Sequence, residues 1–163
     1  PGVTALRCGG SSRAESVFNG LQALLDQGTN PNDWVLVHDA ARCLVTPPMV
    51  DALIDACQHD PVGGLLAIPL PDTLKAEADG RAVATVDRAD KWLAQTPQMF
   101  RLGALHAALA ATAAQGFAGV TDEASAMEMA GHRPLLVPGS ARNFKITYPD
   151  DFALAEAIFR SRA

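Results

Sequence analysis

The chain has 163 residues, of which 48% are hydrophobic and 19% charged, and its formal net charge is −5. This length is typical of one domain, and the hydrophobic content excludes an intrinsically disordered chain. The acidic balance argues against a dedicated nucleic-acid-binding protein, which normally carries a basic stripe.

The first half of the chain alternates helices with buried strands. Apolar residues at i, i+4, i+7 and i+8 from Val17 predict a helix that ends at Gly28. Residues 34–37 form a short unbroken apolar run, typical of a strand buried on both faces. Thr46 is a good N-cap for a second helix, and residues 65–68 predict a second buried strand.

Residues 72–88 break this alternation. Asp79 and Gly80 lie between two extended stretches, which predicts a β-hairpin. An isolated two-stranded hairpin is only marginally stable in water. We therefore expect this hairpin to pack against another surface, such as a second subunit.

The second half resumes the alternation. It predicts an Ala- and Leu-rich helix over residues 102–115, a helix capped by Thr121, a third buried strand at 134–137 and a final helix over 149–161. Strands that alternate with helices are typical of layered α/β domains. We expect such a domain, with a mostly parallel sheet.

The chain also carries signals about its compartment. No apolar run approaches the roughly 18 residues that span a bilayer, and residues 1–10 do not read as a secretory signal. Cys8, Cys43 and Cys57 are odd in number and form no CxxC pair, which predicts neither a disulfide framework nor a zinc site. We expect a cytoplasmic protein that binds neither membrane nor nucleic acid, although a phosphorylated small molecule could still be its ligand.

A polar segment follows the first predicted strand, where ligands of open α/β sheets collect. The Asp39 carboxylate could supply a hard oxygen ligand for Mg²⁺. The planar guanidinium group of Arg42 could donate paired hydrogen bonds to phosphate oxygens. The alternative is an ion pair between these two residues that caps the strand. His38 is expected to be structural.

Two other segments carry weaker signals. The Gly-rich loop at residues 9–16 leads into a helix, so its backbone N–H groups could approach a nucleotide, although such turns are common. Lys145 alternates with Phe144 and Ile146 on a predicted short strand at 143–147. It points either to a solvated face or to a bound phosphate.

Seven segments of the chain form an ordered set: GGSSRAESV (9–17), VHDAAR (37–42), PDTLK (71–75), TVDR (85–88), QTPQMF (95–100), TDEAS (121–125) and NFKIT (143–147). Together they resemble the 2-C-methyl-D-erythritol 4-phosphate cytidylyltransferase family, whose members use CTP in the non-mevalonate pathway of isoprenoid biosynthesis. The resemblance covers essentially the whole chain. The family's N-terminal strand and its Gly-rich triphosphate loop match nothing in this sequence.

The resemblance implies an α/β fold of the Rossmann-like nucleotidyltransferase type, similar to glycosyltransferase A, with a protruding β-hairpin arm. Residues 1–163 would form a single nucleotidyltransferase domain without the N-terminal strand and loop, and residues 70–92 would form the arm within it. The family's arm embraces a second subunit, so the resemblance implies a homodimer in which the arm serves the partner's active site.

The resemblance also implies a reaction and its residues. A polyol phosphate would attack the α-phosphorus of CTP with Mg²⁺ present, releasing pyrophosphate. The nucleotide would contact Gly9, Gly10, Ser16, Asp39 and Ala40. The methylerythritol phosphate would contact Thr73, Arg42, Arg88, Thr96 and Thr121. Lys145 and Arg88 would be catalytic, and Asp39 would hold the metal.

Three alternatives bear on this interpretation. The chain could be a related cytidylyltransferase that acts on ribitol 5-phosphate. It could also be a non-catalytic chain that folds and dimerises, since the triphosphate loop is not matched. A nicotinamide-dependent oxidoreductase is disfavoured because no GxGxxG motif opens a βαβ unit.

Overall fold

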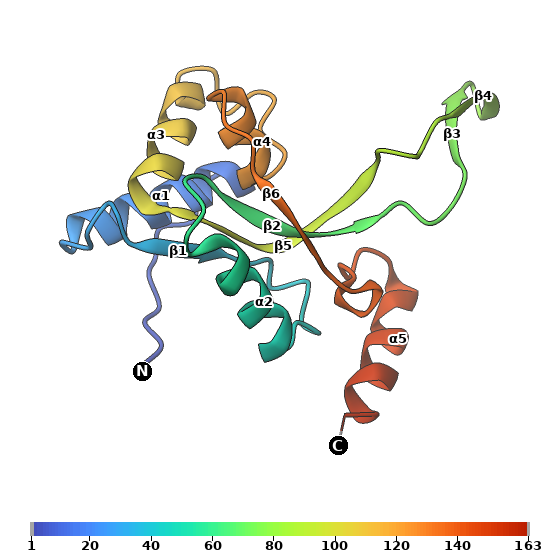
Figure 1. Ribbon diagram of the computed structural model, residues 1–163, viewed down its shortest axis with the longest axis horizontal. Helices are drawn as coiled ribbons and strands as arrows, with labels where there is room; N and C mark the ends of the chain where they lie inside the picture. Colours follow the sequence, from blue (N-terminus) through green and yellow to red (C-terminus); the bar gives the residue numbers. More distant parts are fainter. Residues whose placement is uncertain (1, 163) are drawn as a thin grey trace.

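The computed structural model describes residues 2–162 as an α/β fold (Figure 1). Its elements in chain order are α1 (Arg13–Asp26), β1 (Trp34–Val37), α2 (Pro47–Cys57), β2 (Gly63–Pro69), β3 (Leu74–Ala78), β4 (Arg81–Val86), β5 (Trp92–Arg101), α3 (Leu102–Ala113), α4 (Glu123–Met129), β6 (Leu135–Pro138), a short 3₁₀ turn (Ala141–Asn143) and α5 (Pro149–Arg160). The predicted helices and the three strands predicted to be buried are all present, with small shifts at their ends. The predicted burial holds for β2 but not for β1 and β6, where Leu36, Leu135 and Leu136 are exposed.

The main sheet has the strand order β1-β5-β2-β6. β5 is antiparallel to both β1 and β2, whereas β6 is parallel to β2. β1, β2 and β6 therefore share one direction, and their carboxyl ends lie at the same edge. The prediction of mostly parallel pairing is wrong because β5 runs between two of these strands in the opposite direction.

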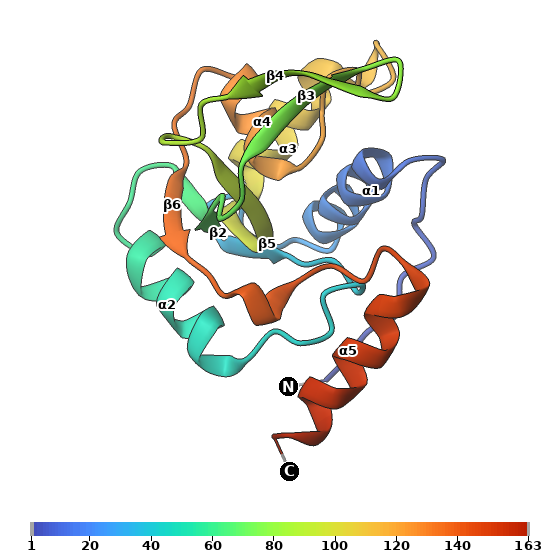
Figure 2. The same ribbon diagram turned by 90° about the vertical axis from the view of Figure 1, so that its right-hand side faces the viewer.

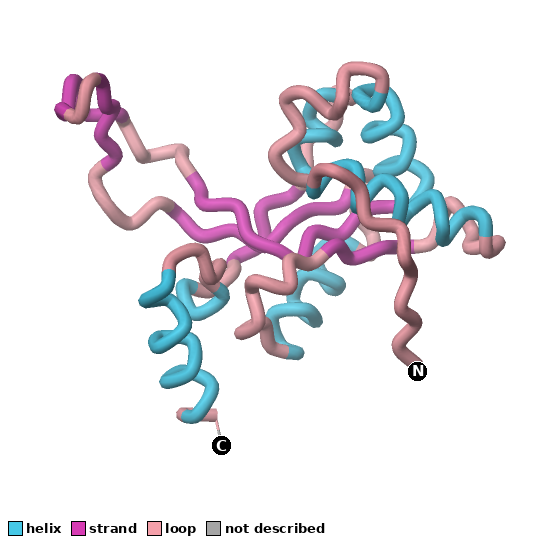
Figure 3. Tube along the Cα trace, turned by 180° about the vertical axis from the view of Figure 1, so that it is seen from behind, coloured by secondary structure: helices cyan, strands magenta, loops and turns pink. Residues whose placement is uncertain are grey.

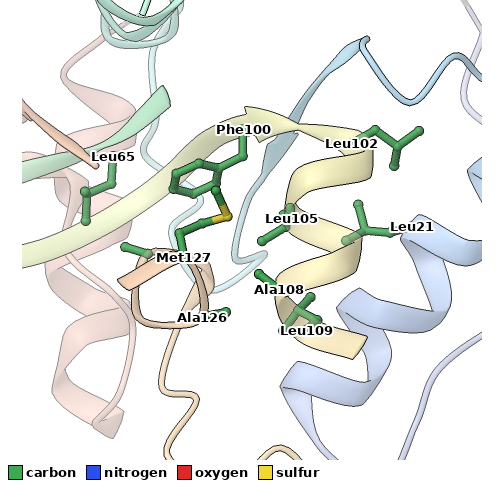
Figure 4. Close-up of a cluster of buried hydrophobic side chains, with 10 residues drawn as sticks. Leu21, Leu65, Phe100, Leu102, Leu105, Ala108, Leu109, Ala126 and Met127 are labelled. Carbon is green, nitrogen blue, oxygen red and sulfur yellow. The ribbon is translucent and has the colours of Figure 1, made fainter. Parts of the chain in front are cut away.

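Helices cover both faces of the sheet, as Figures 1 and 3 show. On one face, α1, α3 and α4 enclose a core in which Phe100 of β5 lies beside Met127 of α4 (Figure 4). On the other face, Leu53 of α2 packs against Leu66 and Met99 of the sheet. Burial of these apolar side chains fixes the sheet between the helices.

The start of α4 differs from the prediction. Asp122, not Thr121, is the N-cap, because its carboxylate accepts a hydrogen bond from the Ser125 N–H at 2.8 Å. The Ser125 hydroxyl oxygen accepts the Asp122 N–H at 3.1 Å, which completes a reciprocal cap. Thr121 is thereby left one residue outside the helix.

The predicted hairpin is the protruding arm of Figures 1 and 2, formed by β3 and β4. Asp79 and Gly80 turn the chain with positive φ angles of 52° and 74°, as a tight hairpin turn requires. At the base of the arm, the Leu70 N–H donates to the Lys91 carbonyl at 3.0 Å. Irregular segments at 70–73 and 87–91 therefore link β2 and β5 to the arm, whose two strands form a separate sheet.

Residues 143–147 do not form the predicted strand. The alternation nevertheless holds, because Phe144 and Ile146 are half-buried while Lys145 is exposed. The Ile146 N–H donates to the Ala41 carbonyl at 2.9 Å, which ties this segment to the loop after β1.

The structure also bears on membrane association. Within residues 2–162, none of the helices has both the length and the apolar character that crossing a bilayer demands.

Candidate active site

A polar pocket of about 250 Å³ lies where the end of β1, the middle of β5 and the segment before α4 meet. Five residues predicted from the sequence line it together: Asp39, Arg42, Thr96, Thr121 and Lys145. Its lining also includes Arg13, Gln95, Gln98 and Asp122.

Asp39 lies between two cations. Its Oδ1 accepts a hydrogen bond from Arg13 Nε at 2.8 Å, and its Oδ2 is 3.0 Å from Lys145 Nζ. Burial alone would raise the pKa of the Asp39 carboxyl, but the hydrogen bonds and charges of Arg13 and Lys145 hold it below its usual value. Asp39 is therefore an ionised, oriented carboxylate at neutral pH.

Arg42 does not form an ion pair with Asp39, so the alternative interpretation of these two residues is wrong. Its guanidinium donates to the Asn143 carbonyl at 2.7 Å and to the Ala94 carbonyl at 3.2 Å. Burial lowers the pKa of Arg42, the Asp39 charge opposes this shift, and the Arg13 charge adds to it. Its Nε is buried and has no hydrogen-bond partner among the described residues. Arg42 therefore fastens the segment before Lys145 to β5.

An irregularity in β5 brings Gln95 and Thr96 into the pocket. Leu65 pairs with Gln98 and Ala67 with Ala94, so three residues of β5 lie opposite one residue of β2. Bulges of this kind turn side chains away from the regular alternation and are common beside functional sites. Pro97 lies within the bulge and has no N–H to give to a regular ladder.

His38 has a structural role, as expected. Its Nδ1 is 3.0 Å from Thr96 Oγ1, and its Nε2 is 3.1 Å from the Arg42 carbonyl oxygen. Thr96 Oγ1 also accepts the Asp39 N–H at 3.0 Å. The histidine therefore holds the loop after β1 against β5.

The remaining predicted residues lie outside this pocket. Gly9, Gly10 and Ser16 belong to the loop and first turn of α1, where the Gly10 N–H donates to Ser16 Oγ at 2.9 Å. Ala40 lines a separate apolar pocket beside α5. Thr73 and Arg88 line a cavity of about 350 Å³ on the arm.

Sequence reasoning missed several residues that build the site. Arg13 lies within the Gly-rich motif, but nothing in the pattern separated it from ordinary surface arginines. Glu123 and Asn143 are 1% and 0% exposed and contact pocket residues. The available signal was Gln98, a polar residue that lies between Pro97 and Met99 in β5, because buried polar side chains need specific partners.

Known proteins resemble this chain over nearly all of its length. The family model for IspD, 2-C-methyl-D-erythritol 4-phosphate cytidylyltransferase, matches residues 3–161. The bifunctional enzyme IspD/IspF of Albidiferax ferrireducens is 65% identical over 96% of this chain, which spans 36% of that protein. The 2-C-methyl-D-erythritol 4-phosphate cytidylyltransferase of Paraburkholderia phytofirmans is 55% identical over 93% of this chain, which spans 65% of that protein.

A solved structure supports the same assignment. The 2-C-methyl-D-erythritol 4-phosphate cytidylyltransferase of Francisella tularensis superposes with a TM-score of 0.84 at 39% identity, covering 91% of this chain and 69% of that one. Sequence, fold and a family model that matches most of the chain agree. The chain therefore belongs to the 2-C-methyl-D-erythritol 4-phosphate cytidylyltransferase family.

Proposed function

We propose that this protein transfers a cytidylyl group from CTP to 2-C-methyl-D-erythritol 4-phosphate. A phosphate oxygen of the polyol phosphate attacks the α-phosphorus of CTP and forms a new P–O bond. The bond from the α-phosphorus to the bridging oxygen breaks, and pyrophosphate leaves. The observation that carries this proposal is the pocket in which Arg13, Arg42 and Lys145 gather around Asp39.

The chemistry of the attacking group explains why cations dominate the pocket. A phosphate monoester has a second pKa near 6, so it is already largely a dianion at neutral pH and needs no general base. The barrier comes mainly from bringing two anions together, which positioned cations lower. The Lys145 side chain is 46% exposed, so its ammonium group is accessible to an incoming phosphate.

We also propose that Asp39 holds Mg²⁺ when the substrates are bound. The Asp39 carboxylate is ionised and accessible from the pocket, but residues 2–162 contain no group of three or more His, Cys, Asp or Glu suited to a metal. One carboxylate fits Mg²⁺, which commonly keeps several waters and binds substrate phosphates. When bound, the ion would neutralise phosphate charge, while the exposed ammonium group of Lys145 would remain available to the phosphates.

The direct test is an assay of the protein with CTP, Mg²⁺ and either 2-C-methyl-D-erythritol 4-phosphate or ribitol 5-phosphate. Release of pyrophosphate is followed continuously, and ³¹P NMR identifies the diphosphate product. We expect turnover with 2-C-methyl-D-erythritol 4-phosphate and much weaker turnover with ribitol 5-phosphate. A clear preference for ribitol 5-phosphate, or no cytidylyl transfer at all, would contradict the proposal.

We further propose a homodimer in which the arm of one subunit completes the site of the other. Thr73 and Arg88 lie on the arm, in a cavity separate from the pocket that contains Lys145. An arm that extends away from the rest of its own chain suits contact with a second copy (Figure 1).

Mixed dimers test this arrangement. At a polyol phosphate concentration well below KM, Arg88→Ala and Lys145→Ala are each expected to have very low activity. A heterodimer of the two variants would contain one site with both residues intact, so a statistical mixture should regain about a quarter of the wild-type activity. Failure to regain activity, although heterodimers form, would mean that each arm serves its own subunit.

We propose the cytoplasm as the location of the protein. Cys8, Cys43 and Cys57 are all free thiols within the described residues, as suits a reducing compartment. Fractionation of cells that express the tagged full chain would test this location.

A further inference from the structure

Glu123 is a buried carboxylate behind the pocket, and it takes no direct part in the proposed reaction. It is the first residue of α4, and its side chain is only 2% exposed. Its Oε1 accepts a hydrogen bond from Arg13 Nη1 at 2.7 Å, and its Oε2 accepts one from Arg13 Nη2 at 2.9 Å. Two parallel bonds of this kind fix the plane of a guanidinium group.

The same guanidinium continues to Asp39. Arg13 Nε donates to Asp39 Oδ1 at 2.8 Å, which leaves Asp39 Oδ2 facing Lys145 Nζ at 3.0 Å. Charges of alternating sign therefore run from the buried Glu123 to the half-exposed ammonium group of Lys145. Each member has its partner on a different segment: α4, the start of α1, the loop after β1, and the segment after the 3₁₀ turn.

A contribution to the stability of the fold does not by itself explain this row of alternating charges. Removing a buried ion pair in favour of apolar side chains is often neutral or stabilising, so such a pair is weak evidence of a stabilising role. The fold already joins α1 to the α3–α4 layer through apolar contacts, including Leu21 and Leu105 (Figure 4). Apolar contacts do not fix the orientation of a charged side chain. A lysine has a flexible four-carbon stem, so its ammonium group needs a fixed partner to be held in one orientation.

We propose that Glu123 is a positioning residue for the cytidylyl transfer. It orients the Arg13 guanidinium, Arg13 orients the Asp39 carboxylate, and Asp39 keeps the Lys145 ammonium group directed into the pocket. This inference rests on the proposed function, in which Lys145 stabilises charge at the reacting phosphorus. Glu123 itself does not line the pocket.

The test is Glu123→Gln in the full chain. Glutamine keeps the shape of the side chain, but its NH₂ group cannot accept the second guanidinium bond, so Arg13 loses its fixed plane. Displaced supporting groups commonly cost about 10- to 100-fold in activity. We expect kcat to fall by that amount, while the KM values for CTP and for the polyol phosphate change far less. Glu128→Gln is the matched control, because Glu128 is an exposed carboxylate on the same helix.

A second measurement reports on Lys145 without catalysis. NMR spectra of the lysine side chains, with the Lys145 signal assigned by its loss in Lys145→Arg, should show that signal shifted in Glu123→Gln and unchanged in Glu128→Gln. If Glu123→Gln fails to fold, Arg13→Lys serves instead, since lysine keeps the positive charge but lacks the planar fork. It is expected to lower kcat and shift the Lys145 signal in the same way.

The outcomes separate this inference from the proposed function. An inactive wild-type chain would refute the proposed function, while the Lys145 signal would still decide whether Glu123 controls the lysine. An active wild-type chain with an unchanged kcat in Glu123→Gln would overturn the inference. An unchanged Lys145 signal in that variant would overturn it as well.

Discussion

Gln98 joins the centre of the sheet to the start of α4, and its replacement by leucine gives a quantitative prediction. Gln98 is 1% exposed and pairs with Val37 on β1 and Leu65 on β2. Its Nε2 donates to Asp122 Oδ2 at 2.8 Å and to the Gln95 carbonyl at 3.2 Å. Its Oε1 accepts the Ala124 N–H at 2.7 Å.

Gln98→Leu removes all three hydrogen bonds with little change in volume, so the cavity contribution is small. A neutral hydrogen bond contributes about 1 kcal/mol net, and a bond to a charged group about 1.5–3 kcal/mol. Two neutral bonds and one bond to the Asp122 carboxylate therefore predict a loss of about 4 kcal/mol in the free energy of unfolding. For a chain of this size, that corresponds to a fall in Tm of roughly 8–16 °C.

Urea unfolding followed by circular dichroism measures the loss. Gln115→Leu is the control, because Gln115 is exposed after α3 and should change the unfolding free energy by less than about 0.5 kcal/mol. A loss below about 1 kcal/mol in Gln98→Leu would refute the view that this side chain fastens α4 to the sheet. The kcat/KM should also fall, because Thr121 and Asp122 lie at the same junction.

Three other predictions concern single residues. Lys145→Ala should chiefly lower kcat, because its charge matters most as negative charge builds at phosphorus; steady-state kinetics with an unchanged kcat would remove it from the catalytic residues. Arg88→Ala should raise KM for the polyol phosphate and leave CTP affinity, measured by calorimetry, nearly unchanged; weakened CTP binding would contradict its assignment to the polyol phosphate. Burial and the Asp60 charge raise the pKa of the Cys57 thiol from 9.0 to about 11, so the folded state keeps its proton while the unfolded state loses it. Stability should therefore fall as pH rises from 9 to 11, by about 2 kcal/mol, and urea unfolding of Cys57→Ala should lack that part of the decline; equal slopes would refute it.

Local patterns were sufficient to predict most of the elements. The hairpin turn at Asp79 and Gly80 and the end of α1 at Gly28 depend on backbone conformations that neighbouring residues signal. β5 was not predicted, because polar residues and Pro97 interrupt its apolar pattern. Their burial depends on partners far along the chain, such as Asp122 and Asn143, and no local pattern contains those partners.

In the candidate site, too, local patterns predict some residues, while only the fold brings the others together. Asp39 and Arg42 follow a strand directly, so their place at the edge of the sheet could be predicted. The resemblance, rather than any pattern, pointed to Lys145. The link between Arg13 and Glu123 spans 110 positions, and only the folded chain brings the two together.

The arm leaves the sheet through β2 and returns through β5, where Pro69 pairs with Trp92. The ladder at the root is complete before the hairpin begins, so changes in hairpin length would not shift the register of Gln95 or Thr96. The length of the hairpin can therefore change without moving Gln95 or Thr96 in the pocket at its root. A longer or shorter tip grafted onto β3 and β4 would change how far the hairpin extends from the sheet without rebuilding the pocket.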